Sequence, residues 1–169
     1  KLAVWLGEQA GLEELAESLQ HEIQKEYPEF AVYLGQETYY HEELPRRVAE
    51  GAARTMAGSR YGLVEFDPGD TYERIFRGIR ALRTAGYSPI LAHIERYGCL
   101  RKEERMQELG SSGCLFQMNY GSLKGHLFSQ DVRWCRRQVS LGRVQLLGTD
   151  MHRTDFRPPE ITEPMKWLE

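Results

Sequence analysis

Apolar and polar residues are grouped along this chain in blocks that predict helices and strands in alternation. Leucine and isoleucine recur at helical spacing within residues 11–25, with Glu and Gln on the opposite face, which is typical of an amphipathic helix. Further helices are predicted over residues 42–57, 71–85, 102–109 and 132–141. Short apolar runs predict strands over residues 30–34, 61–66, 88–94, 114–119 and 144–148.

The alternation of strands and helices indicates the fold class. Several of the predicted strands are apolar throughout rather than on one face, which favours a parallel sheet covered by helices. We therefore expect a single α/β domain over residues 1–169. A barrel and a doubly wound open sheet both fit this pattern, and both place functional sites at the carboxyl ends of their strands.

Composition narrows the class of protein. The formal net charge is −3 and the basic residues are dispersed, which argues against nucleic-acid binding. We find no apolar stretch long enough to span a bilayer and no secretory leader, so we expect no membrane insertion. The three cysteines are odd in number and unevenly placed, which favours a reduced, cytoplasmic protein.

Residues that bind metals follow four of the apolar runs. Taken singly, a Glu after a strand is usually the chain returning to water, and a His in an apolar run is usually a hydrogen-bonded core residue. Together they predict a metal site at one edge of the sheet, because buried carboxylates are costly to ionise without a cation. Mixed carboxylate and imidazole ligands suit manganese, iron or zinc better than calcium. The candidate ligands are Glu37, Glu65, His93, Asp150 and His152.

Two arginines and one cysteine extend this picture. Arg96 and Arg157 follow candidate ligands closely and could hold phosphate oxygens, or could instead pair with Glu95 and Asp155. Cys99 has the Cys-x5-Arg spacing of cysteine-dependent phosphatases. The residues that follow it are helix-forming and partly acidic, whereas a thiolate nucleophile needs a positive setting, so we do not expect Cys99 to be catalytic.

Four segments carry a family resemblance. They are GQETYY (35–40), SRYGLVEF (59–66), IRALRTAGYSPILAHIERY (79–97) and GTDMHRTDFRPP (148–159). The chain resembles the bacterial capsule and exopolysaccharide tyrosine phosphatases of the PHP superfamily. The resemblance implies a distorted (β/α) barrel and hydrolysis of phosphotyrosine by a metal-activated water. It implies two or three manganese ions, with iron, zinc or magnesium as alternatives, and a phosphotyrosine protein as partner, such as the tail of a tyrosine kinase controlling polysaccharide synthesis.

The resemblance also gives each residue a role. It implies that Glu37, His93, Asp150 and His152 are metal ligands, that Glu65 bridges metals, and that Arg96 and Arg157 contact the phosphate. The family's first strand carries a His-x-His pair that this sequence lacks, and its closing helices are also absent. We therefore expect a fragment truncated at both ends that is inactive by itself. A small-molecule phosphomonoesterase of the histidinol-phosphatase type and a non-catalytic relic of the fold are the alternative hypotheses.

Overall fold

The computed structural model describes residues 11–126, 128–152, 159 and 161–169. Its centre is a five-stranded parallel sheet in which the strands lie in sequence order, β1-β2-β3-β4-β5. The strands are β1 (Glu37–Tyr39), β2 (Tyr61–Glu65), β3 (Ser88–Leu91), β4 (Leu115–Asn119) and β5 (Leu146–Gly148). This consecutive order is that of a (β/α) barrel, whereas a doubly wound sheet reverses direction at its middle. The α/β prediction is thus confirmed, and the winding is of the barrel type.

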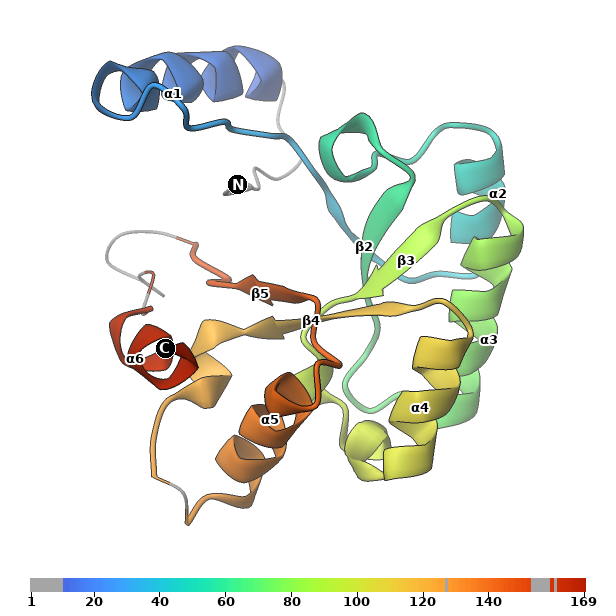
Figure 1. Ribbon diagram of the computed structural model, residues 1–169. Coiled ribbons are helices and arrows are strands. Elements are labelled where there is room, and N and C mark those ends of the chain that lie inside the picture. Colours follow the sequence, from blue (N-terminus) through green and yellow to red (C-terminus); the bar gives the residue numbers. More distant parts are fainter. Residues whose placement is uncertain (1–10, 127, 153–158, 160) are drawn as a thin grey trace.

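Helices alternate with the strands, and most of them cover the sheet from outside. They are α1 (Leu12–Glu26), α2 (Leu44–Ala49), α3 (Tyr72–Thr84), α4 (Glu103–Ser111), α5 (Gln130–Ser140) and α6 (Thr162–Leu168). Figure 1 shows α2, α3, α4 and α5 following the sheet around one side, while α1 lies apart from them. Within the described residues, none of the helices combines the length and apolar character needed to cross a bilayer.

The core lies between the sheet and helices α2 to α5, and α3 contributes several of its fully buried side chains. Ile75, Ile79 and Leu82 recur on one face of α3 and are fully buried. Burying each such side chain contributes about 1.5–3 kcal/mol relative to leaving it in water. Gly78 lets the helix approach the sheet, since a Cβ at this position would lie 2.8 Å from the Phe66 ring. The amphipathic pattern in the sequence thus fixes which side of α3 faces the strands.

The predicted strand over residues 30–34 is wrong. This segment is extended but pairs with no strand, and its backbone is bound by a side chain of α1 instead. The Nε2 of Gln20 donates to the carbonyl of Phe30 over 2.6 Å, and its Oε1 accepts from the amide of Val32. The Nε2 of Gln24 also donates to the Phe30 carbonyl, and the Leu34 carbonyl accepts from the backbone amide of Ala57, so these groups take the place of a neighbouring strand. The first strand begins later, at Glu37, which pairs with Leu63 of β2.

Two further boundaries differ from the prediction. The helix expected over residues 42–57 ends at Ala49, and Gly51 follows with a φ of 70°. The strand expected over residues 88–94 ends at Leu91. His93 then takes a left-handed conformation with a φ of 52°, immediately before the short 3₁₀ helix η2 (Ile94–Arg96). The other predicted strands and helices are confirmed, with shifts of a few residues at their ends.

Candidate metal centre

Two carboxylates and one imidazole meet at one edge of the sheet. Glu37 is the first residue of β1, Glu65 is the last residue of β2, and His93 follows the end of β3. Because Glu37 is in register with Leu63, and Glu65 lies two residues further along β2, both carboxylates project from the same face. His93 has a left-handed backbone conformation, so the direction of its side chain is not set by the up-and-down alternation of side chains along β3.

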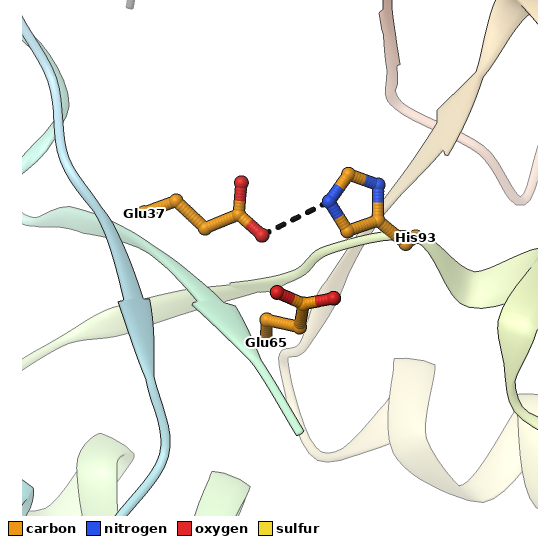
Figure 2. Close-up of side chains that lie close together, drawn as sticks. All are labelled: Glu37, Glu65 and His93. Atoms are coloured by element: carbon orange, nitrogen blue, oxygen red, sulfur yellow. Dashed lines mark hydrogen bonds and ion pairs between the residues drawn. The ribbon is translucent and has the colours of Figure 1, made fainter. Parts of the chain in front are cut away.

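The three side chains are close enough to share one cation. Each offers one ligand atom, and these atoms all lie within 4.8 Å of one another. The Nε2 of His93 lies 2.9 Å from Oε1 of Glu37, and the His93 side chain is buried. Figure 2 shows the carboxylates of Glu37 and Glu65 turned toward the same space as the imidazole edge. Among the described residues, this is the cluster whose geometry suits a metal ion.

Electrostatics at this cluster favour a bound cation. Burial raises the pKa of Glu65, and the negative charge of Glu37 raises it further. Burial lowers the pKa of His93, but the hydrogen bond and the charge of Glu37 outweigh burial, so the net pKa is raised. Both shifts favour the protonated forms of these two groups, which lowers the negative charge of the cluster. A divalent ion would perform the same role, and the N and O donor set fits manganese, iron or zinc.

Arg96 connects this cluster to Asp150. Its Nη1 donates to Oε1 of Glu65 over 2.9 Å, and its Nη2 donates to Oδ2 of Asp150 over 2.7 Å. The alternative pairing of Arg96 with its neighbour Glu95 is not what the structure shows. Arg96 is thus positioned at the candidate site, with its guanidinium among the carboxylates.

The remaining predicted site residues differ in their placement. Asp150 is half-buried and lies beyond the end of β5, with a φ of 49°. His152 is half exposed, and its Nδ1 donates to the backbone carbonyl of Asp150 over 2.9 Å. The structure therefore brings Asp150 to the site through Arg96, whereas His152 lies outside the three-residue cluster. Arg157 lies outside the described residues.

Two amide side chains that the sequence analysis did not single out also contact the site. Asn119, the last residue of β4, lies against both His93 and Asp150, and Gln117 is bonded to the backbone of His93. Asn119 follows the rule by which Glu65 was found, since it is a polar residue at the carboxyl end of an apolar strand, and Gln117 lies two residues earlier in the same strand. They were missed because amides are poor metal ligands beside His and carboxylate.

The cysteines are unsuited to nucleophilic catalysis. Burial raises the pKa of the Cys99 thiol, which outweighs the opposite effect of the nearby Arg105. Burial also raises the pKa of Cys114 to about 12 and that of Cys135 to about 11. A catalytic thiolate needs a lowered pKa, so the prediction that Cys99 is not the nucleophile agrees with its surroundings. All three are free thiols.

Comparisons with known proteins agree with this picture. The family model for capsular polysaccharide synthesis, CpsB/CapC, matches residues 6–169. The tyrosine-protein phosphatase CpsB of Streptococcus pneumoniae is 31% identical over 149 residues, which cover 84% of this chain and 61% of that protein. The tyrosine-protein phosphatase YwqE of Bacillus subtilis is 27% identical over 168 residues, covering 98% of this chain and 66% of that protein.

A solved structure shows the same fold. It belongs to the crystal structures of YwqE from B. subtilis and CpsB from S. pneumoniae, described as unique metal-dependent tyrosine phosphatases. The match has a TM-score of 0.77 at 25% sequence identity and covers 95% of this chain and 65% of that chain. The present chain thus spans somewhat less than two thirds of the length of these proteins. From the family match and these relatives together, the chain belongs to the CpsB/CapC family of capsular polysaccharide synthesis.

Proposed function

We propose that the protein is a manganese-dependent phosphatase that hydrolyses phosphotyrosine in proteins. The observation that carries the proposal is the meeting of Glu37, Glu65 and His93 within 4.8 Å, with the guanidinium of Arg96 directly beside them. A cation site next to a fixed arginine suits a substrate that carries a phosphate dianion. The relatives named as tyrosine-protein phosphatases support the same reaction.

The residues of the chain have separate roles in this proposal. Glu37, Glu65 and His93 hold the metal, and Asp150 and His152 supply further ligands from beyond β5. The bound metal would activate water for attack and offset the charge of the phosphate. More than one ion could be held, with Glu65 as the bridge, because the carboxylates have oxygens to share.

Arg96 is the group placed to orient the substrate. Its guanidinium presents two N–H groups in a fixed plane, which matches two oxygens of a phosphate. It already binds two carboxylate oxygens in this manner, one from Glu65 and one from Asp150. We propose that Arg157 also contacts the phosphate.

Membership of the family supports a proposal for the partner. A chain of the capsular polysaccharide family with a phosphotyrosine site is expected to act on a phosphorylated protein of that synthesis system. We propose the tyrosine-rich tail of the kinase that controls it. The three free thiols suit a reducing compartment, so we propose that the reaction takes place in the cytoplasm.

The test uses the complete encoded protein with Mn²⁺. We expect hydrolysis of a phosphotyrosine peptide to exceed that of histidinol phosphate and other small phosphomonoesters. His93→Ala and Asp150→Ala should each lower kcat by about 100-fold or more, because each removes a proposed ligand of the metal that activates water and offsets the charge of the phosphate. His21→Ala is the matched control, since His21 is an exposed histidine of α1.

Two results would contradict the proposal. A preference for small phosphates would indicate the histidinol-phosphatase type of activity. A protein that binds no transition metal and cleaves no aryl phosphate would indicate a non-catalytic relic of the fold.

A further inference from the structure

A pair of amide side chains on β4 joins the ends of β3 and β5. The Oε1 of Gln117 accepts from the backbone amide of His93 over 2.8 Å, and its Nε2 donates to Oδ1 of Asn119 over 3.0 Å. Oδ1 of Asn119 also lies 3.1 Å from Nδ1 of His93, and its Nδ2 donates to Oδ2 of Asp150 over 3.4 Å. The backbone amide of Asn119 donates to Oε1 of Glu95 over 3.3 Å.

Hydrogen-bond chemistry determines how these amides are oriented. The backbone amide of His93 can only donate, so the oxygen of Gln117 must face it and the Nε2 of Gln117 must face Asn119. Oδ2 of Asp150, which already accepts from Arg96, is an acceptor here, so the nitrogen of Asn119 must face it. Both constraints, from opposite ends, place Oδ1 of Asn119 against the imidazole. Nδ1 of His93 must then carry a hydrogen.

The position of this hydrogen determines the role of the other ring nitrogen of His93. With Nδ1 donating to Asn119, the Nε2 of His93 is the nitrogen that faces Glu37, at 2.9 Å. Nε2 is therefore the atom presented to a cation shared with the carboxylates. Metal-binding histidines commonly have their second nitrogen bound in this way, which fixes the ring and its tautomer.

We infer that Asn119 and Gln117 are positioning residues that hold His93 with Nε2 turned toward the metal site. This inference rests on the proposed function insofar as a metal binds there. Packing supports it independently, because Gln117 is buried and β5 leaves room for its amide. A Cβ at Gly148 would lie only 2.7 Å from Nε2 of Gln117.

The test compares Asn119→Leu with Gln145→Leu in the complete encoded protein. Gln145 is a matched control, since its Oε1 accepts from the backbone of Phe116 in the same strand, and its Nε2 donates to the carbonyl of Gly142. Calorimetric titration with Mn²⁺ should show affinity about 10- to 100-fold weaker for Asn119→Leu and near wild type for Gln145→Leu. The ¹⁵N shifts of the His93 ring, measured with the diamagnetic ion Zn²⁺ bound, should show Nε2 bound to the metal and the hydrogen on Nδ1 in wild type, and loss of this single arrangement in Asn119→Leu.

A conservative replacement of Asn119 provides the second part of the experiment. Asn119→Asp keeps an oxygen opposite Nδ1, so its His93 ring should keep the wild-type tautomer. If Asn119→Leu does not fold, Gln117→Leu carries the same two measurements. Unchanged Mn²⁺ affinity and an unchanged tautomer in the folded variant would overturn the inference. Failure of the proposed function can be distinguished from failure of this inference. A wild-type protein that binds Mn²⁺ but does not hydrolyse phosphotyrosine would contradict the proposed function, while the Mn²⁺ affinity and the His93 tautomer could still be compared between variants.

Discussion

Replacing Arg96 by methionine tests how the site balances its charges. The change removes two charge-assisted hydrogen bonds, of 2.9 Å to Glu65 and 2.7 Å to Asp150, and retains most of the side-chain volume. Each such bond contributes about 1.5–3 kcal/mol. The Arg96 side chain is 33% exposed, so solvent screening weakens both bonds. We expect their combined contribution to the free energy of unfolding to be about 2 kcal/mol. For a chain of this size, that loss lowers Tm by about 4–8 °C.

The loss should depend on metal. In a chelator, Arg96→Met leaves the carboxylates of Glu65 and Asp150 without their cation, and the full loss is expected. With saturating Mn²⁺ the bound ion offsets the same charges, so the loss should fall by more than half. Thermal unfolding followed by circular dichroism, with and without Mn²⁺, measures the difference. Hydrolysis of an aryl phosphate should fall about 100- to 1,000-fold, as for removal of one group that stabilises the transition state.

Arg105→Met is the control for this experiment. Arg105 has similar exposure, at 27%, but it contacts the carbonyl of Cys99 and the ring of Tyr72, outside the site. Its loss of stability should be the same with and without Mn²⁺. If Arg96→Met behaved in the same metal-independent way and kept its kcat, the placement of Arg96 at a metal site would be refuted.

Three further predictions follow from the same structure. In the presence of a chelator, the stability contributed by the raised pKa of His93 should be fully present below about pH 6.5 and lost as pH rises through that raised value; urea midpoints across pH that show the opposite slope would contradict it. Tyr97→Phe should cost about 1–3 kcal/mol in urea unfolding, because the buried Tyr97 hydroxyl accepts from the amide of Phe66 over 3.0 Å. Cys99→Ser should keep kcat with metals bound, and a lost turnover in that variant would restore a thiol mechanism.

Much of the sheet could be predicted from local patterns. Strands β2 to β5 are short apolar runs between turns, and their burial leaves few other structures open to them. The first strand could not be predicted in this way. Strand pairing depends on a second strand that is distant in the sequence. The backbone of the apolar segment at residues 30–34 is instead hydrogen-bonded by the side-chain amide of Gln20. The less apolar Glu37–Tyr39 paired with β2 instead.

The candidate site was predictable in part for a similar reason. Residues that bind cations directly are recognisable by type and by their place after strands, which identified Glu37, Glu65 and His93. Glu37 was identified although it begins its strand rather than ending it. The amides of Gln117 and Asn119 have no such chemical signature, because their role is defined only by the groups that the fold places around them.

The left-handed backbone at two of the candidate ligands has a consequence for evolution. Among the described residues, three that are not glycine have positive φ, and two of them are His93 and Asp150. Such conformations store about 1–3 kcal/mol of strain each. Glycine would relieve that strain but would remove the ligand. In the proposed metal site, selection for metal binding would therefore act against stability at these positions, and a descendant that no longer needs the metal is expected to acquire glycine or asparagine there while keeping its sheet.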